Sequence, residues 1–332
     1  MTVKELILNA KGLLSDNNIE NSQNEVFFIA EKVFQKNRTE LMLHYDSEVS
    51  ECESKEYNRI LEARLSGIPL QYCIGEWDFY GSTYKVGEGV LIPRPETEEL
   101  CDLVLNELKN IAEPTVIDLC SGSGCIGLTL KNNLDNATVF LVEKSREALK
   151  YLIHNAGTVC ENQFVSIVNG DVLNPDSFSE TFEKVDAIIS NPPYIKRNDI
   201  VSLQSEVKFE PRMALDGGED GYDFYRVICK EWPRYLNDRG FIAFECGEEQ
   251  AEYICSLFDS ELFDTSIYKD FNKIENLSSL SVSIYQLVFG LLGLFMIIIG
   301  NVMPKLRMNS IIGLRTPWSL RNEFTWKKSQ HF

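Results

Sequence analysis

The sequence predicts an α/β fold built on a doubly wound parallel sheet. Between residues 115 and 268, short runs of β-branched and other apolar residues alternate with longer segments of helical periodicity. Polar or glycine-rich stretches directly follow three of these runs, as ligand-binding loops do at the carboxyl ends of strands in open α/β sheets. A chain of 332 residues can hold such a domain and a smaller one.

Residues 1–68 are predicted to form a small helical bundle. Two capping boxes, in which Thr or Ser is followed three residues later by Glu, begin at Thr2 and Ser22, and each precedes apolar residues at helical intervals. A third periodic segment, 53–65, ends before Gly67. The bundle has no chemistry of its own, so we expect it to dock a protein partner or to act as a structural cap.

Residues 69–92 are predicted to form a β-hairpin linker, because aromatic and β-branched residues lie on both sides of Gly81. The next loop, 91–98, contains two prolines with charged neighbours and leads into a helix over 98–109. A stiff loop of this kind either covers a pocket or simply begins the helix.

The large domain is expected to span residues 93–275 and to start its sheet with strand 115–119. A glycine loop follows that leads into a helix, and the second strand, 138–143, ends at Glu143. Glycines let a backbone approach a ligand at a helix N-terminus, and an acid about 20 residues later can accept hydrogen bonds from ribose hydroxyls. Glu143 lies 19 positions after Gly124. The candidate cofactor-binding residues of the loop are Cys120, Ser121, Gly122, Ser123 and Gly124.

The same loop also fits the dinucleotide fingerprint, so a nicotinamide oxidoreductase is a rival interpretation. A third strand, 164–168, is followed by Asp171 and Val172. An acid there can accept a hydrogen bond from the amino group of an adenine, with the valine beside the ring. An ordinary turn is the alternative for these two residues.

The central strand, 185–189, leads into Asn191-Pro192-Pro193-Tyr194. Two consecutive prolines make a stiff turn, which holds the asparagine oxygen ready to accept hydrogen bonds from one small planar group. The tyrosine supplies a flat wall. Such a site suits an amide or a base amine as nucleophile, so these four residues are the candidate catalytic residues, and Asn191 is also expected to contact the cofactor. A plain strand-ending turn is the alternative.

Two further pairs of elements complete the predicted sheet: helix 222–232 with strand 240–246, and helix 248–258 with strand 265–268.

Composition excludes several kinds of site. The segment from Ser278 onward has six basic residues and one acid, so residues 1–277 carry −23 against a total of −18, which disfavours direct binding of nucleic acid. The nine cysteines include no Cys-x-x-Cys pair and there are three histidines, so no metal site is predicted. Unpaired thiols and the lack of a signal peptide indicate a cytoplasmic protein.

Five motifs together resemble one family: the class I S-adenosylmethionine-dependent methyltransferases that modify the glutamine of peptide chain release factors on its amide nitrogen. The resemblance covers about residues 1–275. It rests on the motifs at Gly67–Tyr72, Leu91–Glu98, Asp118–Gly124, Asn191–Tyr194 and Glu210–Gly218.

The resemblance implies S-adenosyl-L-methionine as cofactor. Ser121 to Gly124 would wrap its methionine part, Glu143 would bind its ribose, and Asp171 with Val172 would flank its adenine. Two departures are visible, because Cys120 stands where the family commonly has Gly, and Glu143 where it commonly has Asp.

For the substrate, the resemblance implies the glutamine of the GGQ motif of a release factor. Asn191 and the Pro192 carbonyl would hold its NH2 group, Tyr194 would pack on its amide, and the helical bundle would dock the release factor. No strong base is required. Methyltransferases acting on an exocyclic base amine of DNA or RNA share the tetrapeptide and are the nearest alternative, which the acidic body disfavours. A monomer is expected.

Residues 276–332 leave the family's pattern. No charged residue occurs from Asn276 to Pro304, and 282–300 is long and apolar enough for a membrane-spanning helix; a buried helix or a replacement strand at 281–288 is the alternative. The last residues resemble a fragment of an SdpI-type immunity membrane protein. We therefore expect a fused tail that associates with the membrane through 281–303. We also expect that residues 276–288 replace the final strand of the sheet poorly. A catalytically impaired fusion protein is therefore a further alternative.

Overall fold

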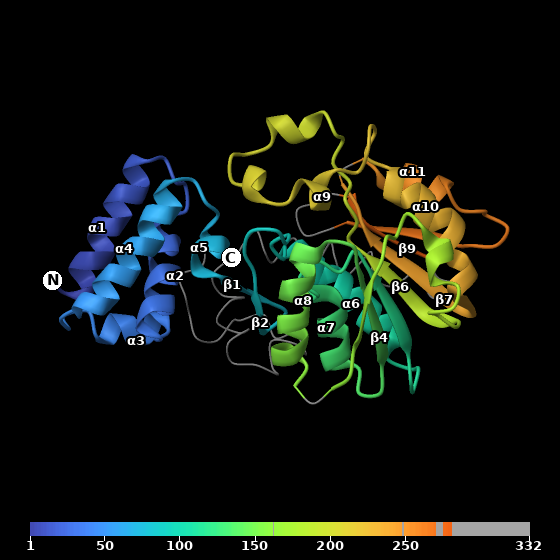
Figure 1. The fold of residues 1–332 in the computed structure, drawn as a ribbon, viewed down its shortest axis with the longest axis horizontal. Helices are drawn as coiled ribbons and strands as arrows, with labels where there is room; N and C mark the ends of the chain where they lie inside the picture. Colours follow the sequence, from blue (N-terminus) through green and yellow to red (C-terminus); the bar gives the residue numbers. More distant parts are fainter. Residues whose placement is uncertain (162, 248, 270–274, 281–332) are drawn as a thin grey trace, which may run out of the picture.

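A seven-stranded sheet organises the larger part of the chain in the computed structural model, which describes residues 1–161, 163–247, 249–269 and 275–280. Its strand order is β5-β4-β3-β6-β7-β9-β8 (Figure 1). The strands are β3 (Thr115–Leu119), β4 (Thr138–Glu143), β5 (Ser166–Asn169), β6 (Val185–Ser190), β7 (Leu236–Glu245), β8 (Thr265–Lys269) and β9 (Glu275–Leu280).

The strands β3 to β7 run parallel, and β3 pairs with both β4 and β6. The chain therefore winds outward from β3 in one direction through β4 and β5, and then in the other direction through β6 and β7. Ligands of open α/β sheets bind where the winding reverses, at the carboxyl ends of the strands. The predicted fold class is confirmed, and the reversal lies between the glycine loop after β3 and Asn191 after β6.

Helices cover both faces of the sheet (Figure 1). Side chains alternate along each strand, so Val116 and Ile117 of β3 enter different cores. One core is closed by α6 (Glu96–Leu108), α7 (Cys125–Asn133) and α8 (Arg146–Val159), and the other by α10 (Asp223–Glu231) and α11 (Ala251–Ser256). Shorter helical segments are α9 (Arg212–Leu215) and the 3-10 turns Pro175–Phe178, Asp199–Ser202, Val207–Phe209 and Trp232–Tyr235.

The helical bundle at the start of the chain has its own core. Its long helices are α1 (Val3–Asp16), α2 (Ser22–Phe34) and α4 (Glu51–Leu65), as predicted, and two short ones that the periodicity did not indicate are α3 (Arg38–Leu43) and α5 (Leu70–Ile74). Thr2 forms the predicted capping box with Glu5.

The capping box predicted at Ser22 is wrong, because Ser22 lies inside α2 and no side chain caps that helix. The carboxylate of Glu25 turns instead to the buried Arg64 of α4, with N–O distances of 2.7 and 3.1 Å. The same guanidinium donates to Glu206 at 2.5 Å. Because Glu206 lies between β6 and β7, this second, partly exposed ion pair ties the bundle to the larger domain.

The predicted hairpin is present as β1 (Glu76–Phe79) and β2 (Ser82–Lys85), which pair antiparallel. Asn155 of α8 fixes the hairpin, because it accepts from the Lys85 N–H at 2.8 Å and donates to the Lys85 carbonyl at 3.1 Å. Its Nδ2 also donates to the Ser123 carbonyl at 2.9 Å, which connects the hairpin to the glycine loop.

The last strand of the sheet comes from the segment expected to replace the family's own strand. Residues 275–280 form β9, which pairs antiparallel with both β7 and β8. Whether this strand replaces the family's strand poorly stays a prediction. Main-chain groups make these pairs, so a segment without proline can supply them without a family motif. The expected helix over 282–300 and the alternative strand 281–288 lie outside the described residues. Within the described part of the chain, no helix has the length and apolarity to cross a membrane.

Candidate active site

A pocket lies at the carboxyl ends of β3, β4, β5 and β6, beside the reversal of winding. It brings together most of the residues singled out from the sequence: Cys120, Ser121, Gly122, Ser123, Glu143, Asp171, Val172, Asn191 and Pro193. Gly124, Pro192 and Tyr194 are neighbours of lining residues but are not among them. The roles given to these residues stay predictions.

The glycine loop turns sharply under the pocket. Cys120, Gly122 and Gly124 all have positive φ, of 60°, 55° and 83°. A β-carbon on Gly124 would lie 2.4 Å from a methyl of Leu152, so this position also needs glycine for space. Cys120 adopts the left-handed conformation despite its side chain, which gives a physical reason for the glycine that the resembling family commonly has there.

Glu143 is held under the loop at the end of β4. Its carboxylate accepts the Gly122 N–H at 2.8 Å and the Ser145 N–H at 2.6 Å, and the residue is buried. Burial raises the pKa of this carboxyl, while these backbone hydrogen bonds lower it. Each carboxylate oxygen can accept more than one hydrogen bond, so capacity for a ligand remains.

Asp171 and Val172 follow β5 at the pocket wall. The Asp171 carboxylate pairs with Lys144 at 2.6 Å and accepts the Leu173 N–H at 3.1 Å. Val172 is buried, and its carbonyl accepts from the indole N–H of Trp232 at 3.1 Å. The backbone here is therefore fixed from the core side, and it also forms a turn, in which the Asn174 N–H donates to the Asp171 carbonyl at 2.8 Å.

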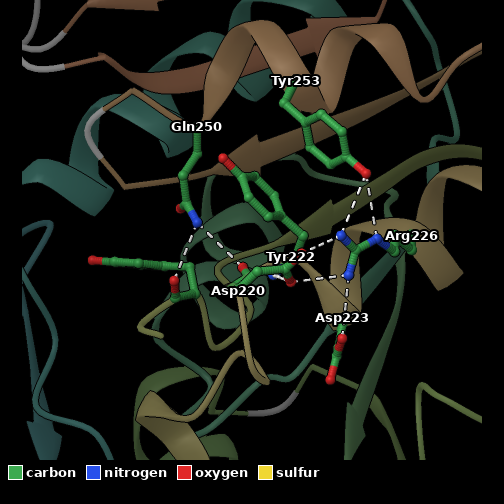
Figure 2. Close-up of polar contacts among 8 residues, drawn as sticks. Asp220, Tyr222, Asp223, Arg226, Gln250 and Tyr253 are labelled. Carbon is green, nitrogen blue, oxygen red and sulfur yellow. Dashed lines mark hydrogen bonds and ion pairs between the residues drawn. The ribbon is translucent and has the colours of Figure 1, made fainter. Parts of the chain in front are cut away.

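Asn191 and its turn are held by contacts from behind. Ser190 donates to the Leu119 carbonyl at 2.7 Å, which joins the ends of β6 and β3. Gln250 donates to the carbonyls of Tyr194 and Gly221, both at 3.2 Å (Figure 2). A β-carbon on Gly217 would lie 2.8 Å from the Pro193 carbonyl oxygen, so the chain passes close behind the prolines.

Figure 2 also shows how the segment behind this turn is fixed. Arg226 of α10 pairs with Asp220 and Asp223, and it donates to the hydroxyl of Tyr253 on α11 at 3.4 Å. The rings of Tyr222 and Tyr253 meet edge to face at 4.5 Å between centroids. These contacts hold α10, α11 and the loop before α10 together. Gln250 connects this group to the turn through its hydrogen bond to the Tyr194 carbonyl.

The proline loop 91–98 lines the pocket, as the first of its two sequence interpretations requires. Glu210, which is buried, accepts the Ile92 N–H at 3.1 Å and forms an ion pair with Arg94. Pro211 and Met213, which follow it, also line the pocket. Two motifs separated by more than a hundred residues thus form one wall.

Sequence reasoning missed two polar residues behind Asn191. Thr97 of α6 accepts from the Asn191 amide nitrogen at 3.3 Å and donates to Glu245 at 2.5 Å. Glu245 ends β7 and is buried, and burial raises the pKa of its carboxyl to about 7. The available signal was an acid directly after the apolar run 241–244, but nothing in the sequence indicated the partners of that acid.

Comparison with known proteins agrees with this geometry. Residues 5–75 match the model of the PrmC N-terminal domain, and residues 97–209 match that of the methyltransferase small domain. A release factor glutamine methyltransferase of Bacillus cereus is 37% identical over 256 residues, which cover 76% of this chain and 88% of that protein. The chain belongs to the release factor glutamine methyltransferase family.

Two other members of the family cover different shares of the chain. The protein of Clostridium acetobutylicum is 34% identical over 83% of this chain and 96% of its own length. That of Thermodesulfovibrio yellowstonii is 42% identical over 62% of this chain and 74% of its own. Residues 305–332 match the model of the SdpI/YfhL protein family, which confirms the second resemblance.

Proposed function

We propose that this protein transfers a methyl group from S-adenosyl-L-methionine to the side-chain amide nitrogen of the glutamine in the GGQ motif of a peptide chain release factor. One observation carries the proposal beyond family membership. The side chain of Asn191, an acceptor suited to a planar NH2 group, lines the same pocket as the glycine loop and Glu143. A methyl donor and its acceptor would therefore meet in one place.

The residues of the pocket fit the cofactor. Glu143 has acceptor capacity left for ribose hydroxyls, Asp171 offers a carboxylate to an adenine amine, and the left-handed loop at Cys120 to Gly124 brings backbone groups to the pocket wall. Apolar walls for the adenine ring come from Val142 and Val172. When bound, S-adenosyl-L-methionine supplies an electrophilic methyl group on its sulfonium.

The chain's own contribution is to position the weak nucleophile. An amide nitrogen is a poor nucleophile because its lone pair is delocalised into the carbonyl group. Asn191 Oδ1 and the Pro192 carbonyl would accept its two N–H groups, which fixes its direction and stabilises the positive charge that develops on nitrogen. Tyr194 would pack on the amide plane, and Gln250 holds the Tyr194 backbone in place.

The proposal also assigns the remaining parts of the chain. The helical bundle would dock the release factor, and the ion pair of Arg64 with Glu206 would keep the bundle in a fixed position relative to the pocket. The enzyme would act as a cytoplasmic monomer, and residues 281–303 would associate with the membrane.

The test is transfer of labelled methyl to a purified release factor by the full chain in detergent. Wild-type protein should label the GGQ glutamine, and Asn191→Ala should abolish transfer while its affinity for S-adenosyl-L-methionine stays within about threefold. Label on DNA or RNA instead of the release factor would refute the assigned substrate. Equal loss of transfer and of cofactor binding in Asn191→Ala would refute the role given to Asn191.

A further inference from the structure

The support behind Asn191 is a directional chain of hydrogen bonds. The Asn191 amide nitrogen donates to the Thr97 hydroxyl at 3.3 Å, and that hydroxyl donates to the Glu245 carboxylate at 2.5 Å. The donors therefore lead from Asn191, through Thr97, which lines the pocket, to Glu245, which does not.

The fold places these three residues together by strand register and helix position. Ser190 of β6 and Phe244 of β7 are paired in the parallel ladder, so the residues that follow them, Asn191 and Glu245, are neighbours at the same edge. Thr97 comes from the first turn of α6, which packs across β7. Thr97 is 2% exposed and Glu245 4%, so water does not compete for these groups.

A side-chain amide can present either its oxygen or its NH2 group to a pocket. The two orientations differ only in which group meets the acceptors behind it. Because the Thr97 hydroxyl accepts from the NH2 group of Asn191 and donates to Glu245, that NH2 group is held by Thr97 and the amide oxygen of Asn191 is left for the pocket. A negative charge behind the NH2 group also polarises the amide and makes its oxygen a stronger acceptor.

We propose that Glu245 is a positioning residue for methyl transfer, which together with Thr97 fixes and polarises Asn191 so that its oxygen receives the substrate NH2 group. This inference rests on the proposed function and adds to it a residue that touches neither cofactor nor substrate. The ionised carboxylate is the active form, because a protonated Glu245 would donate to the Thr97 hydroxyl. That hydroxyl would then donate its own proton to Asn191 and favour the reversed orientation of the amide.

Several groups from neighbouring elements act on this carboxyl. All causes together raise the pKa of Glu245 to about 7: burial is the largest of them and Glu96 also raises the pKa, while Thr97, Asn191 and Arg94 lower it. Tyr194, Tyr225 and Cys125 also face this carboxyl; burial raises the pKa of all three, and the Glu245 charge adds to that increase. A pH dependence near neutrality is therefore expected of the transfer step.

The experiment compares the full-length wild type with Glu245→Gln, Thr97→Val and Thr97→Ser in detergent, using labelled S-adenosyl-L-methionine and purified release factor. Glu245→Gln keeps the shape and removes the charge, and we expect kcat to fall about tenfold with KM for the release factor and cofactor Kd within about twofold. Wild-type kcat should rise with pH through about 7, and the profile of Glu245→Gln should be flat.

Thr97 provides the matched pair. Valine removes the hydroxyl at nearly constant volume and should lower kcat about as much as Glu245→Gln, whereas serine keeps the hydroxyl and should restore it to within about threefold of wild type. This pair decides the matter if Glu245→Gln fails to fold. If the wild type is active, an unchanged kcat in Glu245→Gln would refute the positioning role but not the proposed function. Equal kcat values for Thr97→Val and Thr97→Ser would do the same. Absence of label with wild type would refute the proposed function and this inference together.

Discussion

Replacing Glu245 by glutamine should stabilise the protein at alkaline pH although it slows the enzyme. The carboxyl is 4% exposed, and burial raises its pKa from 4.5 to about 7. A shift of this size corresponds to about 3 kcal/mol, at about 1.4 kcal/mol for each pH unit. Because the folded protein prefers the protonated acid, the free energy of unfolding falls as pH rises from 4.5 to 7 and stays constant above.

Glutamine cannot ionise, so the variant escapes this loss. At pH 5 the protonated acid and the amide resemble each other, and the two proteins should differ by no more than about 1 kcal/mol, the worth of a changed hydrogen bond. At pH 8.5 the free energy of unfolding of the variant, relative to that of the wild type, should be about 3 kcal/mol higher than at pH 5. All other titratable groups are common to both proteins, so subtracting the two curves isolates position 245.

The assay is urea denaturation of both proteins at pH 5, 6, 7 and 8.5 without cofactor, followed by tryptophan fluorescence. Equal m-values in the two proteins would show that the same surface is exposed on unfolding. A stability difference that changes by less than about 0.5 kcal/mol across this pH range would refute the reasoning, because Glu245 would then not be a buried charge at neutral pH. A buried residue with only a structural role would not combine higher stability with lower kcat.

Three further predictions follow from the packing. Arg64→Met should lower the free energy of unfolding by about 3–5 kcal/mol in chemical denaturation, because Glu25 would be left buried without its cation. Adding Glu25→Leu should recover most of the lost free energy. Wild-type stability of Arg64→Met would contradict this prediction. Gly217→Ala should reduce methyl transfer at least tenfold and leave cofactor affinity unchanged, because its β-carbon would lie 2.8 Å from the Pro193 carbonyl oxygen; normal transfer would show that the turn adapts. A chain ending at Leu280 should keep the melting temperature of the full chain. A chain ending at residue 274 should melt at a lower temperature, because β7 and β8 lose their shared partner. Equal melting temperatures for the two would show that β9 adds no thermal stability.

The sequence by itself determined the order of the elements and the location of the pocket. Apolar periodicity gave β3 and β4 with the observed bounds, and the polar stretches after β3, β4, β5 and β6 meet because the carboxyl ends of parallel strands share one edge. The glycine loop and Asn191 could be found because special backbone geometry needs glycine and proline, whose effects are local. These signals do not depend on distant partners.

Only the tertiary structure decided which side chains support that site. Ser22 and Glu25 have the spacing of a capping box, yet Glu25 pairs with Arg64 because a buried carboxylate gains more from a cation than from a helix end. Thr97 and Glu245 lie 148 residues apart and meet at 2.5 Å. Long-range contacts of this kind are set by how α6 packs on the sheet and by strand register, and neither leaves a periodic trace in the sequence. Position in the chain thus identified Asn191, and packing supplied the partners that orient it.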